Sequence, residues 1–525
     1  MKKQGFVRGI MLLGIFGGIS KVLGAIYRIP LTHILTSEGM GLYQMVFPLY
    51  SLLLALSSSG FPASISKLIA EYNQRGKIQS SKTILKISLC LLFLFSVVCA
   101  VFLWIFGSKI AEIQGNEQAS ELYIAIAPAV VIVGLISGFK GFFQGNEDMV
   151  PSSVSMIVEQ SAKLFFGLLL AKIFSSLGTG MAALGAVIGV LLSEVITLVF
   201  MFVYYIIFNK KCKKSLIIDE KNTNKFYIRQ ILALSLPITI GSLIMPACMF
   251  VDSTLIVNLL QSVGNSVEEA TSLFGLASGV VGAIVNMPVV FSLAIGTAIV
   301  PLASRTCAEK NKLKTQKHMS LSLVLTFAII LPCSIIMMVF GDWIIDFLYG
   351  ASLTDVQSSI SARLLGFGAF SAISLSLVQV TASFLQGLGK NYVPALSLFV
   401  GALFKICLTC LLIPRGVSIF AAEISSAVCY GVAAVINLSI ILKNYKFVMK
   451  SELMKILSGC VLIFAGSLIT KKVILAFASG KIALILSLIA VFVVVLVVYY
   501  MMYKKEINNF LSTLQSKRIK KQLNK

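Results

Sequence analysis

Charged side chains are scarce in this sequence. They make up 12% of its 525 residues, whereas 58% of the residues are hydrophobic and the mean hydropathy is +0.94. Soluble domains carry about 25% charged residues, so the chain is not a set of soluble domains. Apolar runs of about 20 residues recur along it, and each can cross a hydrocarbon core of about 30 Å. The composition therefore predicts an all-α polytopic membrane protein.

Histidines and the common catalytic motifs are also scarce or missing. His33 and His318 are the only histidines, and two histidines cannot build a metal site alone. We recognise no Ser/His/Asp set, no Walker loop and no dinucleotide-binding fingerprint. The sequence thus predicts no catalytic residue, no metal and no cofactor, and a protein that is not an enzyme. Any work it performs must draw on an ion gradient or on the membrane potential.

The ten cysteines do not suggest a disulfide framework. Most of them fall within apolar runs, and none lies in a predicted outer loop. Cys407 and Cys410 form a single C-x-x-C pair in an apolar segment. Because no second pair accompanies them, we interpret these thiols as packing residues rather than as metal ligands.

The apolar runs predict fourteen membrane-spanning helices. We place them near 8–31, 40–62, 84–107, 122–143, 152–174, 181–208, 229–260, 271–303, 319–341, 358–387, 392–413, 417–442, 453–475 and 480–503. The first run is not expected to be a cleaved signal peptide, since charges interrupt it, no Ala-x-Ala site follows it and more spans come after it.

The distribution of basic residues predicts the orientation of these spans. With the N-terminus in the cytoplasm, 33 lysines and arginines lie on inner segments and six on outer segments. Short cytoplasmic loops of membrane proteins carry the excess of Lys and Arg. Both termini are therefore expected in the cytoplasm.

The formal net charge of +23 is explained by the same loops. The cations flank membrane spans, as in NKKCKK and in the tail KRIKKQLNK, and such clusters bind anionic membrane lipid. No soluble module is available to present a groove reader or a stacking platform, so we expect no nucleic-acid binding.

An internal repeat divides the chain. The segment FFQGNEDMVPSSVSMIVEQSAK, from Phe142 to Lys163, recurs as FLQGLGKNYVPALSLFVGALFK, from Phe384 to Lys405. Helices one to six are thus expected to repeat as helices seven to twelve. Six is an even number of crossings, so the two halves have parallel topology and are related by an axis along the membrane normal.

This repeat predicts the domain organisation. We expect a six-helix bundle at 1–208, a basic cytoplasmic linker at 209–228, a second six-helix bundle at 229–442, two additional transmembrane helices at 443–503 and a basic cytoplasmic tail at 504–525. Substrate sites in such folds lie between the halves, and alternating access arises when one half rocks against the other.

Two cations interrupt the first apolar run. Lys21 and Arg28 are seven residues apart, about two helical turns, so both project from nearly the same face of one helix. A lysine near the bilayer centre costs about 2.5–3.5 kcal/mol on insertion scales and normally faces protein or a water-filled cavity. Arg28 has the alternative of extending to the outer headgroups. Lys21 is too deep for that.

Other charges fall within later spans. Glu159 and Lys163 are spaced i, i+4 with the acid first, which favours a structural ion pair on one helix; a moving gate is the alternative, and Glu194 is expected to share this cluster. The second half carries two acids and two bases on four helices, namely Asp252, Arg363, Lys405 and Glu423.

Three motifs carry a family resemblance. They are SKVLGAIYRIP at 20–30, EGMGLYQM at 38–45 and GFPASISKLIAE at 60–71. With its two six-helix bundles the chain resembles the multidrug/oligosaccharidyl-lipid/polysaccharide exporter superfamily. The motifs are similar to those of the stage V sporulation protein B and lipid II flippase branch, and the resemblance covers nearly the whole chain.

This resemblance implies a flippase. Its substrate would be a lipid-linked saccharide, the undecaprenyl-diphosphate-linked peptidoglycan precursor lipid II, which passes from the inner to the outer leaflet of a bacterial plasma membrane. A cationic cavity would receive the diphosphate, and we assign Lys21, Arg28 and Arg363 to it. Lys21 matches the first cation of the family pattern; the Gram-negative-type pattern has its second cation where this chain has Tyr27, and Arg28 follows one residue later. The two extra helices would hold the polyprenyl tail, and cell-wall synthases are the expected protein partners.

The resemblance also raises ion coupling. Members of this superfamily can bind sodium or protons in one bundle, and Asp252, with Lys405 and Glu423, is the best candidate here. An ammonium at Lys405 would occupy the place of the metal. Coupling to sodium or protons and drive by the membrane potential both remain open.

Two other classes of function remain open. A cation-coupled multidrug exporter of the same superfamily would have twelve spans and an acidic or aromatic cavity, which the cations of the first span do not favour. A membrane-embedded glycan polymerase or ligase would carry chemistry in its outer loops, and these loops are short and offer no acid/base set.

The predicted orientation can be tested by cysteine labelling in intact cells. In a cysteine-free background, a cysteine at Lys214 or Lys517 should resist a membrane-impermeant maleimide, while a cysteine at Glu117 should react, because only the last is on a predicted outer loop. External labelling at Lys214 would reverse the orientation.

Overall fold

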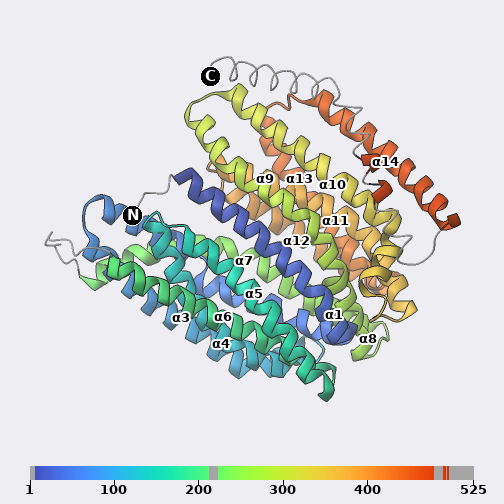
Figure 1. Ribbon diagram of the computed structural model, residues 1–525, viewed down its shortest axis with the longest axis horizontal. Coiled ribbons are helices and arrows are strands. Elements are labelled where there is room, and N and C mark those ends of the chain that lie inside the picture. The colour runs from blue at the N-terminus through green and yellow to red at the C-terminus, as the bar shows by residue number, and fades with distance from the viewer. Residues whose placement is uncertain (1–5, 212–222, 478–488, 492, 496–525) are drawn as a thin grey trace, which may run out of the picture.

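Long helices lie side by side throughout the structure, a computed structural model that describes residues 6–211, 223–477, 489–491 and 493–495. Within these ranges the regular elements are helices, with no strand. Figure 1 shows α3, α4 and α6 along one side of the molecule and α9, α10 and α14 along the other, with α1 between them. This is the all-α polytopic architecture that the composition predicts.

The first half holds six helices and one short 3-10 turn. Their bounds are α1 Phe6–Ser58, α2 Phe61–Gln74, α3 Ile78–Ile113, α4 Ala119–Gly145, α5 Val150–Phe174, the turn Ser175–Leu177 and α6 Thr179–Lys211.

The rest of the described chain holds eight α-helices and two π-helical segments. Their bounds are α7 Asn224–Ser262, α8 Val267–Gly275, π-helix Leu276–Val281, α9 Gly282–Ala308, α10 Lys312–Tyr349, α11 Asp355–Gly387, α12 Tyr392–Leu412, π-helix Ile413–Val417, α13 Phe420–Asn444 and α14 Lys450–Phe477.

Helix α1 contains the first two expected spans. Instead of a loop near 32–39, a single residue, Thr36, breaks the helix with φ 60° and ψ −175°. A threonine in this region of backbone space costs about 1–3 kcal/mol and persists only where its surroundings hold it. Here Thr179 Oγ1 donates to Glu38 (3.3 Å) and Ser272 Oγ donates to Ser37 (2.7 Å). The bend at Thr36 is thus fixed by both halves of the chain.

Twelve described helices are long and apolar enough to cross a membrane, and the first of them, Leu12–Gln74, holds both segments of α1. Each expected span from 8–31 to 453–475 therefore lies in one of these helices, which makes the chain a multi-pass membrane protein. The fourteenth span, 480–503, lies mostly outside the described residues, as do most of the linker 209–228 and the tail 504–525. The count of fourteen remains a prediction.

Each half has its own apolar core. In the first half, α1 packs on α4, α5 and α6 around buried residues such as Tyr27, Tyr123 and Val187. In the second half, α9, α11 and α13 pack around Val285, Leu365 and their neighbours. The two-bundle organisation and its boundaries remain a prediction, which this packing supports.

Helix α14 attaches to the second half through α10. The Lys471 ammonium donates to Asp342 (2.8 Å) and to the Val339 carbonyl (2.7 Å), and it lies 5.4 Å from the centre of the Trp343 ring. These contacts fix one end of α14 on α10.

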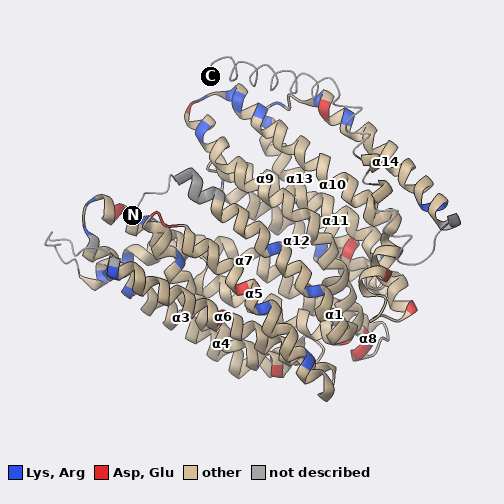
Figure 2. Cartoon of the chain, viewed as in Figure 1, with Lys and Arg blue, Asp and Glu red and all other residues tan. Residues whose placement is uncertain are grey.

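Charged residues collect at the helix ends. Figure 2 shows Lys and Arg mainly along the upper and left ends of the helices, and acidic residues prominent near α8 at the lower right. We call these the α2 end and the α8 end, after the short helices α2 and α8. Their charge difference fits the prediction that the α2 end faces the cytoplasm.

The contact between α5 and α6 generates a prediction about stability. A Cβ atom at Gly189 would lie 2.4 Å from the Gly167 Cα, whereas a Cβ at Gly366 would meet nothing within 4 Å. Gly189→Ala should push the two helices apart and lower the stability by about 1–3 kcal/mol. Gly366→Ala should leave the protein as stable or slightly more stable, since alanine favours a helix. Thermal unfolding in detergent measures both; equal melting temperatures would contradict this packing.

Candidate functional site

The first segment of α1 lies between the two halves. A Cβ at Gly24 would lie 3.1 Å from Gln160 of α5, and a Cβ at Gly14 would lie 3.7 Å from Thr297 of α9. Lys21 belongs to this segment, its side chain is exposed, and among the described residues it has no hydrogen-bond or ion-pair partner. An unpaired ammonium in a membrane-spanning helix needs an anion or water. Its place between the halves is where a substrate site of this architecture is expected.

Arg28 lies two turns closer to the α8 end. It is half-buried, and its charge acts on the buried hydroxyls of Tyr27 and Tyr349. Tyr349 ends α10, so Arg28 lies within electrostatic reach of a residue of the second half as well as of its own helix. This arrangement favours a role between the halves over an extension to lipid headgroups.

Arg363 lies on α11, in the second half. It is exposed on α11 and lines a shallow cavity of about 400 Å3 with Asp355, Ser359 and their neighbours. All the lining residues come from α11. The described contacts therefore do not bring Arg363 together with Lys21 and Arg28, and its part in one cationic site remains a prediction.

Lys163 does not form the expected ion pair with Glu159. Its ammonium lies 5.4 Å from the centre of the Tyr27 ring and 5.2 Å from that of Phe47, and the ion pairs of the described residues do not include it. Cation–π contacts of this kind are worth about 0.5–2 kcal/mol. Lys163 thus contacts two rings of α1 instead of the Glu159 carboxylate on its own helix α5. The i, i+4 spacing of Glu159 and Lys163 could not reveal these rings.

The acids beside Lys163 form a cluster without an ion pair. Glu159 accepts from the Gln160 amide (3.1 Å), and Glu194, which is buried, lies within electrostatic reach of Glu159, Lys140 and Lys163. The structure thus places Glu159 and Lys163 of α5 near Glu194 of α6 and Lys140 of α4, and their role as a structural pair or a gate remains a prediction. Lys140, which lies within the predicted span 122–143, was not singled out from the sequence.

Asp252 and Lys405 form a direct ion pair. Lys405 Nζ lies 2.6 Å from Asp252 Oδ2, and their side chains are 17% and 20% exposed. Glu423 lies near Lys405 and accepts a hydrogen bond from Ser371 Oγ (2.7 Å). The ammonium of Lys405 therefore compensates the Asp252 carboxylate directly, and coupling to sodium or protons at this group remains a prediction. Arg363 takes no part in this group.

The α8 ends of the two halves meet at a seam that the sequence did not predict. We define it by Ser37, Gly41, Thr271, Ser272 and Gly275. A Cβ at Gly41 would lie 2.1 Å from the Thr271 carbonyl oxygen, and a Cβ at Gly275 would lie 2.1 Å from that of Ser37. Only glycine allows two backbones to approach so closely.

His33 strengthens the closure beside this seam. Its ring nitrogens lie 2.8 Å from the Leu348 carbonyl oxygen and 2.8 Å from Ser352 Oγ, between α10 and α11. Gln357 of α11 also donates to Ser37 (2.9 Å). The α8 end is thus closed by contacts between α1 and the second half. His33 stands out in the sequence as one of two histidines, but from the sequence we considered it only as a metal ligand.

Metal and disulfide chemistry have no visible site in the described residues. They contain no group of three or more metal-ligating side chains, and their nine cysteines are free.

Two family descriptions match the chain. Residues 6–307 match the family described as polysaccharide biosynthesis protein, and residues 237–411 match the MatE family. The first match covers more than half of the sequence.

Curated relatives agree with these matches. The chain is 28% identical to stage V sporulation protein B of Bacillus subtilis over 69% of this chain and 70% of that protein. It is 25% identical to the lipid II flippase MurJ of Bacillus subtilis over 77% and 76%.

Solved structures share the fold. A lipid II flippase MurJ in an inward closed conformation has a TM-score of 0.74 at 14% identity and covers 95% of this chain and 100% of its own. A multidrug resistance MATE family transporter in an inward-facing conformation has a TM-score of 0.66 at 16% identity, with 83% and 95% covered. The chain belongs to the polysaccharide biosynthesis protein family, within the multidrug/oligosaccharidyl-lipid/polysaccharide superfamily of membrane transporters and flippases.

Proposed function

We propose that this protein flips a lipid-linked saccharide across a bacterial plasma membrane by alternating access. The proposed substrate is lipid II, whose diphosphate would bind at Lys21 and Arg28. The observation that carries the proposal is an unpaired ammonium on α1 between the two halves. Charge-assisted contacts with phosphate are strong polar interactions in a low-dielectric cavity.

The closed α8 end supports a direction for the cycle. With the α8 end outside, the seam and His33 seal the outer face, so the cavity would open to the inner leaflet, where the substrate is made available. The substrate would bind first, and the α8 end would open afterwards, when Gly41 of α1 moves away from α8. Arg363 shares no described contact with Lys21 or Arg28, and it would meet the diphosphate in a later state of the cycle.

A multidrug exporter is the second candidate. The MatE match and the MATE fold similarity favour it. Cationic drugs would meet an unpaired Lys21 and the Arg28 guanidinium, which repel them. The charge of the α1 face therefore favours an anionic substrate over a cationic one.

The ion pair in the second half supports drive by the membrane potential. An ammonium already compensates Asp252, so no sodium ion is needed there. An inside-negative potential favours the inward-facing state of an empty carrier whose cavity is positive. Moving one elementary charge across 100 mV is worth about 2.3 kcal/mol. Binding of the diphosphate would neutralise the cavity and let the loaded carrier turn outward.

Lys21→Ala should lower flipping at least about tenfold, because one charge-assisted contact is worth about 1.5–3 kcal/mol. A membrane-impermeant probe of outer-leaflet lipid II, applied after depletion of the native flippase, measures the rate. Lys21→Arg should keep activity, and Lys172→Ala, which removes a cation near the α8 end of α5, should have little effect. Full complementation by both Lys21→Ala and Arg28→Ala at normal expression would reject the site.

Replacement of sodium by choline, at constant potential and pH, should leave flipping unchanged. The reason is the Lys405 ammonium 2.6 Å from Asp252. Collapse of the potential at constant sodium is the matched arm and should stop flipping. Sodium-dependent flipping that disappears in Asp252→Asn would instead establish an ion site.

A further inference from the structure

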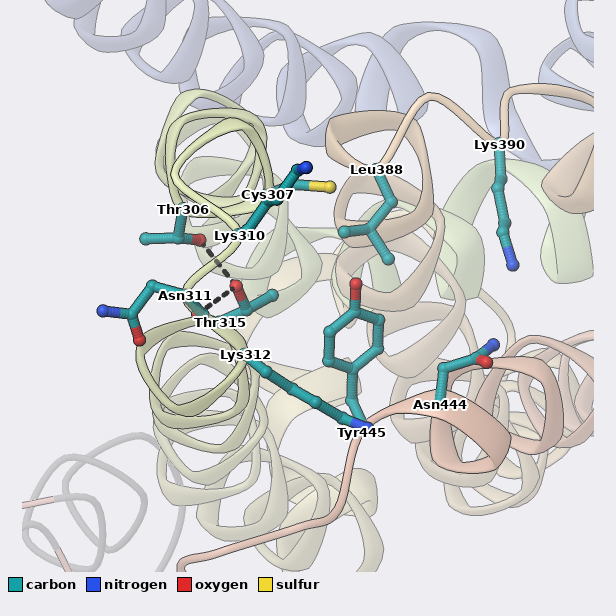
Figure 3. A pocket seen from close by; sticks show the side chains of 10 residues that line it. All are labelled: Thr306, Cys307, Lys310, Asn311, Lys312, Thr315, Leu388, Lys390, Asn444 and Tyr445. Carbon is teal, nitrogen blue, oxygen red and sulfur yellow. Dashed lines mark hydrogen bonds between the residues drawn. The ribbon is translucent and has the colours of Figure 1, made fainter.

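A cationic pocket opens at the α2 end of the second half, away from Lys21. Its volume is about 420 Å3. Three connections form it: the turn between α9 and α10, the turn between α11 and α12, and the end of α13 (Figure 3). It is lined by Thr306, Cys307, Lys310, Asn311, Lys312, Thr315, Leu388, Lys390, Asn444 and Tyr445.

Three lysines and no carboxylate line this pocket. Lys310, Lys312 and Lys390 come from two different turns, and none of them has an ion-pair partner among the described residues. The nearest acid in sequence, Glu309, is engaged by Arg305 (3.0 Å) and Lys314 (3.9 Å). The pocket therefore carries uncompensated positive charge.

Neutral hydrogen-bonding groups complete the wall. Thr315 donates to Thr306 (2.9 Å), and both are buried. Tyr445 packs edge-on against Phe384, and Figure 3 shows its hydroxyl directed toward the side of Cys307 and Leu388. Burial, together with the neighbouring Cys307 thiol, raises the pKa of Tyr445, so its hydroxyl stays protonated.

The internal repeat supplies a comparison with the first half. There the corresponding turns are tied together: Asn73 donates to Asn146 (3.0 Å), and Ser81 donates to Asn73 (2.7 Å). Asp148 accepts from the Tyr204 hydroxyl (3.0 Å). A hydrogen-bonded network joins the turns of the first half.

The matching positions of the second half cannot form this network. Leu388 takes the place of Asn146 and Lys390 that of Asp148, and the intervening Glu147 and Gly389 both have positive φ, 60° and 78°. Gly76 and Lys310 are the positive-φ residues of the corresponding turns after α2 and α9. Asn73 lies three residues before Gly76 and Cys307 three residues before Lys310, so Cys307 takes the place of Asn73. The second half therefore lacks the two amides of Asn73 and Asn146 and has a lysine in place of Asp148, and it has an open cationic pocket where the first half has the network.

We propose that the pocket formed by Lys310, Lys312, Lys390 and Tyr445 binds a phosphate-bearing anion, as the headgroup of an anionic phospholipid or as a soluble phosphate compound. Ammonium groups are compact charges suited to phosphate oxygens. The bound anion would link the α9–α10 and α11–α12 turns, which amides link in the first half. This site is separate from the proposed substrate site and does not rest on the proposed function.

The test compares two triple variants of the full-length purified protein. Lys310→Gln/Lys312→Gln/Lys390→Gln removes the pocket charges; Lys317→Gln/Lys443→Gln/Lys446→Gln removes as many exposed charges nearby, outside the pocket. Binding of a tail-labelled phosphatidylglycerol and of inorganic pyrophosphate is measured for each. We expect the pocket variant to weaken binding about tenfold, the equivalent of one charge-assisted contact, and the control to weaken it less than about twofold.

The two probes distinguish the source of the phosphate. Selective loss of phosphatidylglycerol binding supports a lipid headgroup, and selective loss of pyrophosphate binding supports a soluble ligand. Equal losses in the two triple variants, or no loss in either, would overturn the proposal. Cys307→Asn/Leu388→Asn restores the amides of the first half without a change in charge; it should close the pocket and weaken binding similarly, and unchanged binding would also contradict the proposal.

Discussion

A charged side chain within a bilayer must meet an opposite charge, an aromatic ring or water, and this requirement constrains three lysines in the described spans. Lys405 meets Asp252, and Lys163 meets the rings of Tyr27 and Phe47. Lys21 meets none of these among the described residues. Two of these embedded lysines are therefore already compensated by the protein, and the third is available to a ligand.

The repeat makes this contrast sharper. Lys163 and Lys405 occupy corresponding positions of the two copies, yet one lies over aromatic rings and the other pairs with a carboxylate. Duplication has kept the backbone position and changed its chemistry. The same holds at the α2 end, where amides close the turns of the first half and lysines surround a pocket in the second. The two halves share corresponding backbone positions but differ in the charges and partners at those positions.

Much of the fold could be predicted because its signals are local or repeated. Apolar runs predict the described spans, and the motif around Gln144 and Gln386 predicts a repeat whose boundaries stay a prediction. The partners of the charges could not be predicted, because they come from other helices: Phe47 reaches Lys163 across α1 and α5, and Asp252 reaches Lys405 across α7 and α12. The backbone conformation of Thr36 has no sequence signature, so the continuous path of α1 was also missed.

The seam at the α8 end joins α1 to α8 through backbone, with uncharged residues on both sides: Ser37, Gly41, Thr271, Ser272 and Gly275. A contact without an ionisable group does not respond to protonation, and salt screens it little. Within the seam, closure therefore depends on how closely the two backbones approach, and an ionisable side chain, His33, lies only beside it. The five seam residues therefore sense the relative position of the two halves through backbone contact and neutral hydrogen bonds alone.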